Sequence, residues 1–182
     1  SARRLALPEL PEEDFVASLV DLVRADAAWV PSGEGESLYL RPFAFASEAF
    51  LGVRPSKVVD YYVIASPSGS YFTNGLEPIS IWVTTEYHRA GRGGTGAAKT
   101  GGNYASSLLP QQEAYAQGCD QVCFLDDVSQ RNLEELGGMN IMVVDADGTV
   151  RTPRLTGTIL EGSTRSAIIR LLRDSGRSVV ED

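Results

Sequence analysis

The chain has 182 residues, of which 43% are hydrophobic and 22% are charged, and its net charge at pH 7 is −8. The negative charge argues against a nucleic-acid binder, and no apolar run approaches the ~20 residues that span a bilayer. We therefore expect a globular, cytoplasmic protein that binds neither nucleic acid nor membrane.

The first half of the sequence predicts a helix followed by strands. Apolar residues recur at helical spacing over 11–26, and acidic residues fill the first turn of that segment. The strand predicted at 38–45 places Tyr39 and Arg41 on one face, which fits either a snorkelling arginine on an edge strand or a functional face. Further strands are expected at 58–66 and 79–85, with a hairpin turn at 67–69 that returns through Tyr71.

The second half of the sequence mixes helices and strands. The glycine-rich stretch 89–102 predicts a connection between two lobes. A helix is expected over 103–117, with a kink or break at Pro110. A last helix begins near 163 with Ile168, Ile169, Leu171 and Leu172 on its buried side. Strands are expected at 122–125, 139–144 and 150–152. These elements predict an α+β fold of two lobes joined near residues 74–96.

Lys99 is the strongest candidate for chemistry. It is one of only two lysines in the chain and lies between two glycine pairs. Small neighbours leave room for a flat ring, and we expect desolvation to make the amine a good nucleophile toward a carbonyl cofactor. A lysine in a flexible loop is the alternative. A phosphate-binding nucleotide loop is disfavoured, because the glycine spacing before Lys99 does not fit one.

Two other segments allow more than one interpretation. Residues 162–165 open the last helix, whose first N–H groups could hold a phosphate, although a plain Ser/Thr cap is the simpler interpretation. Glu134 and Glu135 precede a glycine pair, which is typical of a solvated turn. The only cysteines, Cys119 and Cys123, and a single histidine argue against a metal site and predict reduced thiols.

Taken together, the segments resemble the branched-chain amino acid aminotransferases, which are pyridoxal-phosphate enzymes of fold type IV. The motif Ala-Lys-Thr-Gly-Gly-Asn-Tyr-Ala-Ser-Ser-Leu at 98–108 carries the resemblance. Segments 38–42, 135–140 and 155–165 agree with the family in order and approximate spacing. The resemblance implies the central portion of such an enzyme. It assigns 1–73 to a small substrate-side domain, 74–96 to an interdomain connection and 97–182 to the first part of a large pseudo-barrel domain that binds the cofactor.

The resemblance also implies the roles of single residues toward pyridoxal 5′-phosphate. Lys99 holds the cofactor as an internal aldimine and shuttles the proton, while Tyr104 bonds the ring hydroxyl. Glu135 pairs with the ring nitrogen, and the backbone N–H groups of Ser163 and Thr164 hold the phosphate.

The implied reaction is transamination of leucine, isoleucine or valine with 2-oxoglutarate by a homodimer. The substrate amino acid, glutamate and the 2-oxo acids are expected to contact Tyr39, Arg41, Tyr71 and Gly138. Two alternatives stay open. One is an inactive or incomplete fragment that serves only as a folding or assembly unit, and the other is a pyridoxal-phosphate lyase of the same fold.

Overall fold

The computed structural model describes residues 1–69 and 77–182. The chain divides into two compact units, Ala2–Glu77 and Pro78–Asp182, with Ser1 joining the second. This boundary differs from the connection expected at 74–96. Residues 78–96 belong to the second unit because a strand at 81–83 pairs there and Arg89 is buried. Tyr71 lies outside the described residues.

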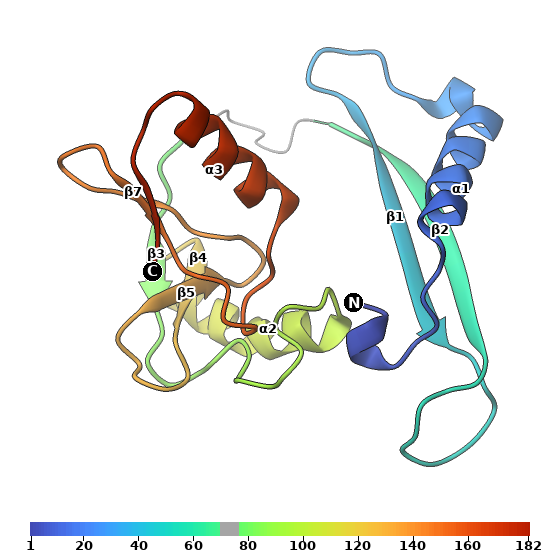
Figure 1. Ribbon diagram of the computed structural model, residues 1–182, viewed down its shortest axis with the longest axis horizontal. Helices are drawn as coiled ribbons and strands as arrows, with labels where there is room; N and C mark the ends of the chain where they lie inside the picture. The colour runs from blue at the N-terminus through green and yellow to red at the C-terminus, as the bar shows by residue number, and fades with distance from the viewer. Residues whose placement is uncertain (70–76) are drawn as a thin grey trace. The chain divides into compact units, whose positions relative to one another are not determined.

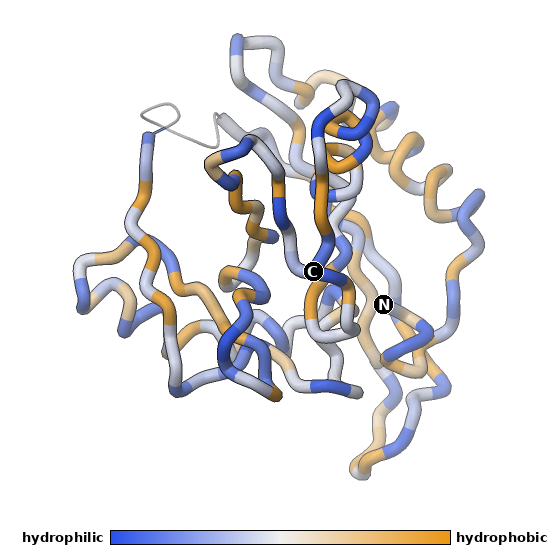
Figure 2. The backbone as a smooth tube through the Cα atoms, turned by 60° about the vertical axis from the view of Figure 1, so that its left-hand side comes forward, coloured by the Kyte–Doolittle hydropathy of each residue, from blue (hydrophilic) through white to orange (hydrophobic). Residues whose placement is uncertain are grey.

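The first unit is a helix on a two-stranded antiparallel ribbon (Figure 1). Helix α1 (Glu12–Ala25) begins with three acidic residues, which complement the positive end of the helix dipole. Apolar and polar residues alternate along it (Figure 2). Phe15 packs on Tyr61 of the ribbon, with ring centroids 6.3 Å apart. Two short 3₁₀ turns, η1 (Arg3–Leu5) and η2 (Ala27–Trp29), flank the helix.

The ribbon consists of β1 (Ser37–Ala46) and β2 (Val59–Ser68), which confirms both strand predictions. The turn predicted at 67–69 is wrong for its first two residues, because Pro67 pairs with Leu38 and Ser68 with Ser37. The ladder between β1 and β2 thus continues to Ser68.

The second unit holds the buried core, beside a three-stranded sheet in the order β3-β4-β5. Strand β3 (Ile81–Val83) runs parallel to β4 (Gln121–Leu125), and β5 (Leu133–Leu136) runs antiparallel to β4. Helix α2 (Gly101–Ala116) packs on β4, and Ala114, Val122 and Phe124 form the buried cluster between them. Cys119 and Cys123 are free thiols, as expected.

A second sheet in the same unit has the order β6-β7-β8. Strand β6 (Val143–Val144) is antiparallel to β7 (Val150–Thr152), and β8 (Val179–Glu181) is parallel to β7. Helix α3 (Ser163–Asp174) precedes β8. The tight turn between β6 and β7 includes Gly148, whose φ of 85° is one that glycine adopts without strain.

Several expectations for this unit are corrected. Helix α2 continues through Pro110 without the expected break, and the proline ring is fully buried. The strand expected at 139–144 shrinks to two residues. On α3, Ile169 is buried as expected, but Ile168 and Leu171 are 38% and 68% exposed, and Arg165 joins Ile169 on the buried side.

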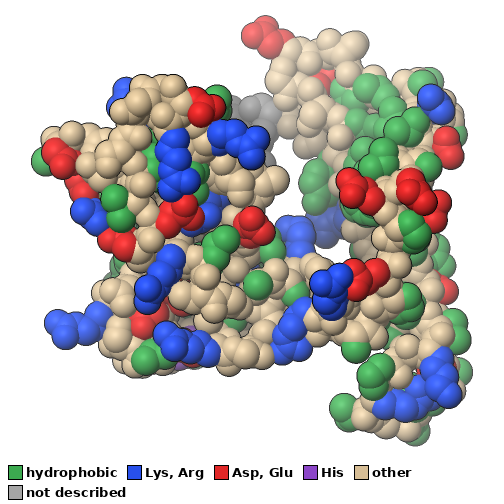
Figure 3. All heavy atoms as spheres, viewed as in Figure 1, with side chains coloured by type: hydrophobic (Ala, Val, Ile, Leu, Met, Phe, Trp, Pro, Cys, Tyr) green, Lys and Arg blue, Asp and Glu red, His purple; other side chains and the backbone are tan. Residues whose placement is uncertain are grey.

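Three further findings concern membrane spans, surface charge and metal ligands. Among residues 1–69 and 77–182, no helix combines the length and the apolar character needed to cross a bilayer. On the face shown in Figure 3, acidic and basic side chains are interspersed. No group of three potential metal ligands occurs in the described part of the chain.

Candidate active site

Lys99 lies in the loop that enters α2, and its amine contacts a phenol. The Nζ atom of Lys99 donates a hydrogen bond of 2.9 Å to Oη of Tyr104, and it lies 5.4 Å from the centre of that ring. The expected enclosure of the amine is not found, because Lys99 is exposed. Its glycine and alanine neighbours carry no side chain large enough to cover it.

Residues 95–98, which precede Lys99 and are called the lysine loop here, are held by a side chain of α2. Asn103, in the first turn of that helix, is only 3% exposed. Its side-chain amide donates to the carbonyls of Thr95 and Ala98 at 2.8 and 2.7 Å. These bonds fix the direction in which the chain reaches Lys99.

Glu135 lies on β5, and the structure corrects the interpretation of its segment as a solvated turn. The residue is 3% exposed, and its Oε2 lies 2.9 Å from Nη1 of Arg89 in a buried ion pair. The backbone N–H of Leu160 donates to the same oxygen at 3.3 Å, and the Asn140 amide donates to Oε1 at 3.1 Å. The carboxylate is therefore neutralised and hydrogen-bonded, as burial requires.

The protonation of Glu135 reflects opposing influences. Burial raises the pKa of its carboxyl above the usual value, while the positive charge of Arg89 and the N–H of Leu160 lower it. The charge of Lys99 also lowers this pKa, as the weakest of these influences. A Cβ added to Gly138, just past β5, would lie 3.9 Å from the Tyr104 ring, so the glycine pair passes beside the phenol.

Glu134 is the second buried carboxylate of β5, at 8% exposure. Its Oε1 accepts a hydrogen bond of 2.6 Å from the Thr158 hydroxyl, which in turn lies 2.7 Å from the hydroxyl of Thr156. Thr158 thus joins the acidic strand to the segment that leads into α3.

The N-terminus of α3 has the properties of an anion site. Its N-cap is Gly162, and no side chain caps the helix, which excludes the plain Ser/Thr cap. Ser163 and Thr164 occupy the first helical positions and are exposed. Their N–H groups face the end of the helix where the dipole favours negative charge.

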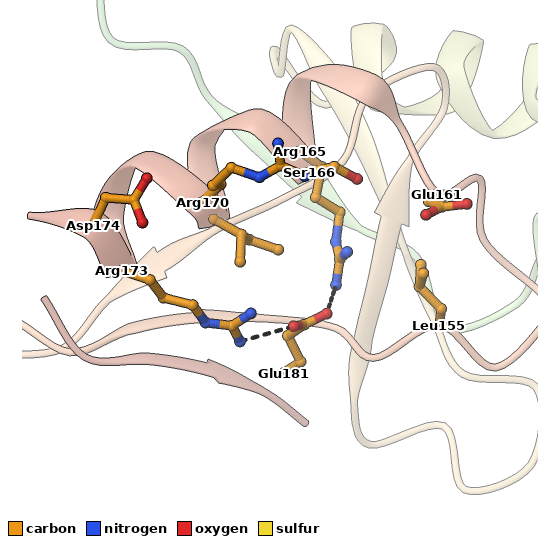
Figure 4. Close-up of a pocket in the computed structure, with 9 residues that line it drawn as sticks. Leu155, Glu161, Arg165, Ser166, Arg170, Arg173, Asp174 and Glu181 are labelled. Carbon is orange, nitrogen blue, oxygen red and sulfur yellow. Dashed lines mark hydrogen bonds and ion pairs between the residues drawn. The ribbon is translucent and has the colours of Figure 1, made fainter.

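The cavity of about 310 Å³ along α3 is a separate feature (Figure 4). Its lining includes Arg165 and Glu181, which form an ion pair of 2.9 Å, but neither Lys99 nor Glu135.

The other predicted residues, Tyr39 and Arg41, lie in the first unit on β1. Nη2 of Arg41 donates a hydrogen bond of 3.1 Å to Oη of Tyr39, and both side chains are exposed. On the same strand face, Phe43 stacks on Tyr62 with ring centroids 5.7 Å apart. The arginine therefore lies on an aromatic face, as the strand alternation predicts.

Arg89 is the residue that the sequence interpretation missed. It lies in a segment rich in glycine and basic residues, which is typical of an exposed connection. The signal that could have found it is chemical. An acid placed on an apolar strand needs a cationic partner when it is buried, and Arg89 is that partner for Glu135.

Comparison with known proteins identifies the family. Residues 1–182 match the Amino-transferase class IV family. The chain is 56% identical over 185 residues to a branched-chain-amino-acid aminotransferase of Mycobacterium tuberculosis, covering 100% of this chain and 50% of that protein. It is 53% identical to a probable branched-chain-amino-acid aminotransferase of Streptomyces coelicolor, again covering 100% and 50%.

Solved structures of aminotransferases have the fold of this chain. The branched-chain amino acid aminotransferase of Escherichia coli superposes with a TM-score of 0.82 at 32% identity, covering 100% of this chain and 58% of that one. An aminotransferase of Brucella abortus bound to the cofactor PLP gives 0.78 at 28% identity, covering 100% and 61%. The α+β, fold-type IV class expected from the sequence is confirmed. The chain spans about half the length of the curated relatives it matches, and it belongs to the class IV aminotransferase family.

Proposed function

We propose that the protein carrying this chain transfers amino groups between leucine, isoleucine or valine and 2-oxoglutarate, with pyridoxal 5′-phosphate as its cofactor. The observation that carries the proposal is the hydrogen bond from the Lys99 amine to Tyr104, whose ring lies beside Gly138, just after the strand that carries the buried Glu135. The names of the curated relatives support the substrate class.

The chemistry of the available groups fits this cofactor. Its aldehyde calls for a primary amine, its ring hydroxyl for a hydrogen-bond partner, its protonated ring nitrogen for a carboxylate, and its phosphate for N–H donors. Lys99, Tyr104 and Glu135 supply the first three. The uncapped first turn of α3, at Ser163 and Thr164, supplies the fourth.

Each residue then has a definite task. When bound, the cofactor supplies an aldehyde that condenses with amines and a ring that withdraws the electron pair released at the substrate α-carbon. Nζ of Lys99 acts as the base that takes the α-proton, and it returns a proton in the reverse half-reaction. Tyr104 orients Nζ by accepting its hydrogen bond. Ionised Glu135 favours the protonated ring nitrogen, which strengthens the ring as an electron acceptor.

We propose the face of β1 for the substrate side. The exposed guanidinium of Arg41, bonded to Tyr39, is a cation that can pair with the side-chain carboxylate of 2-oxoglutarate. The neighbouring Phe43 offers apolar surface to an aliphatic side chain. Tyr71 and Gly138 are assigned to substrate binding on the family resemblance. The homodimeric state is proposed on the same resemblance, and the cytoplasmic location is proposed on composition.

The test is chemical labelling of the protein in its full natural length. Borohydride reduction in the presence of cofactor, followed by digestion and mass spectrometry, is expected to place a pyridoxyl group on Lys99. Lys57, the only other lysine of the chain, is the internal control. Lys99→Ala is expected to abolish production of the 2-oxo acid from leucine, whereas Lys57→Ala retains it. A label on Lys57 alone, or an active Lys99→Ala variant, would refute the assignment.

A further inference from the structure

Arg89 is a buried cation whose position is fixed from both ends. Its side chain is 3% exposed, and its carbonyl accepts a hydrogen bond of 3.0 Å from the Ser106 hydroxyl on α2. Its Nε has no hydrogen-bond partner among residues 1–69 and 77–182. The ion pair and the hydrogen bonds that its side chain makes come from Nη1.

Three segments of the site meet at this Nη1 atom. It lies 2.9 Å from Oε2 of Glu135, 3.5 Å from the carbonyl of Gly96 and 3.3 Å from the carbonyl of Thr158. Gly96 belongs to the lysine loop, residues 95–98, and Thr158 lies on the segment whose Leu160 also bonds Glu135. The loop and this segment are in direct contact, because a Cβ on Gly96 would collide with the Thr158 carbonyl.

We propose that Arg89 is a positioning residue of this site, which holds the Glu135 carboxylate and the lysine loop in one fixed arrangement. The inference rests on the proposed function, in which Glu135 faces the ring nitrogen of the cofactor. Arg89 touches none of the reacting atoms. It acts through the carboxylate on one side and through the backbone of Gly96 on the other.

The charge of Arg89 also bears on the protonation of its partner. Burial raises the pKa of Glu135, and Arg89 is the strongest of the groups that lower it. Without that charge the carboxyl keeps its proton to a higher pH, and a neutral acid cannot pair with a protonated ring nitrogen. A lysine at position 89 would keep the charge, but its side chain is one atom shorter, so its ammonium group does not reach the place of Nη1 and its three contacts.

The experiment compares Arg89→Gln with Arg92→Gln in the full-length protein. Arg92 is an exposed arginine three residues later in the same segment and serves as the matched control. One readout is the pH dependence of kcat/KM and of the absorption band of the bound cofactor. The other is amide hydrogen exchange over 95–98 in the cofactor-free protein, which does not depend on activity.

In Arg89→Gln, the acidic limb of the pH profile is expected to move to higher pH. We also expect kcat to fall about tenfold or more, as when other orienting partners of functional groups are removed. Exchange over 95–98 is expected to become faster, whereas Arg92→Gln behaves like the wild type. Arg89→Lys is expected to restore the acidic limb but not the protection of the loop.

A wild-type acidic limb or wild-type exchange in Arg89→Gln would overturn the inference. If Arg89→Gln does not fold, the Arg89→Lys variant tests the positioning role in its place. Faster exchange over 95–98 at unchanged helix content supports the positioning role, and unchanged exchange refutes it. If the wild type itself binds no cofactor at Lys99, the proposed function fails, and the exchange measurement still tests the contact between Arg89 and the loop.

Discussion

The side-chain amide of Asn103 donates a hydrogen bond of 2.7 Å to the carbonyl of Ala98, the residue directly before Lys99. The same amide donates to the carbonyl of Thr95 at 2.8 Å, and its oxygen accepts a bond of 2.7 Å from the Thr95 hydroxyl. One buried side chain in the first turn of α2 therefore determines the path of the loop that presents the amine.

Replacing Asn103 tests this relationship. Asn103→Ala is expected to lower the free energy of unfolding by about 2–3 kcal/mol, because it removes the donor that two carbonyls use. Asn103→Asp keeps the shape of the side chain but replaces the donor with an acceptor. We therefore expect the free energy of unfolding to fall by at least as much as in Asn103→Ala. Asn132→Ala, at an exposed asparagine, is the control. Urea unfolding of the cofactor-free protein measures all three, and equal losses at 103 and 132 would contradict the prediction.

Gly96 occupies a place where no side chain fits. A Cβ there would overlap the backbone carbonyl of Thr158, which cannot rotate away as a flexible side chain could. Gly96→Ala is therefore expected to destabilise the protein by about 3 kcal/mol, the upper end of the cost of overpacking. At Gly101 a Cβ meets no atom within 4 Å, so Gly101→Ala should be close to neutral. Thermal unfolding of both variants decides, and a neutral Gly96→Ala would show that the close approach is absent.

The parts of the fold that could be predicted are those with local causes. The acidic first turn and apolar spacing of α1 lie within one segment. The lysine motif at 98–108 is equally local, since Lys99, Asn103 and Tyr104 share one loop and one helical turn.

The missed features depend on contacts between segments distant in the sequence. Glu134 and Glu135 look like a solvated turn until Arg89 and Thr158 are placed against them. Arg89 has no local pattern of its own that distinguishes it from an exposed arginine. The burial of Arg165 on α3 likewise depends on a distant partner, Glu181, with which it forms an ion pair.

Two arginines share Glu181 and allow a matched comparison (Figure 4). Arg165 is 2% exposed in its side chain and also donates to the carbonyl of Pro153 at 2.8 Å, whereas Arg173 is 52% exposed. Arg165→Gln should cost about 1–3 kcal/mol, because it breaks an ion pair whose arginine is buried and leaves the partly buried Pro153 carbonyl without its donor. Arg173→Gln should cost less than ~1 kcal/mol, as is usual for an exposed pair. Chemical denaturation measures both, and a larger loss at Arg173 would contradict this account.

The buried carboxyl of Glu134 should make stability depend on pH in a definite direction. Burial raises its pKa, although the hydrogen bond from Thr158 lowers it. A carboxyl with a higher pKa in the folded than in the unfolded protein favours folding when protonated, so its contribution is present at low pH and is lost as the pH rises through the folded-state pKa. Glutamine stays neutral, and its carbonyl oxygen can still accept the bond from Thr158.

We therefore expect Glu134→Gln to gain stability over the wild type as the pH rises above about 4, the usual range of a glutamate pKa. The gain should level off once the wild-type carboxyl is fully ionised in the folded protein. Urea unfolding at a series of pH values measures the difference, with Glu86→Gln, at an exposed glutamate, as the control for adding an amide. A difference that shrinks with rising pH would mean that the ionised form of Glu134 stabilises the fold, as a carboxylate bound by a cation would.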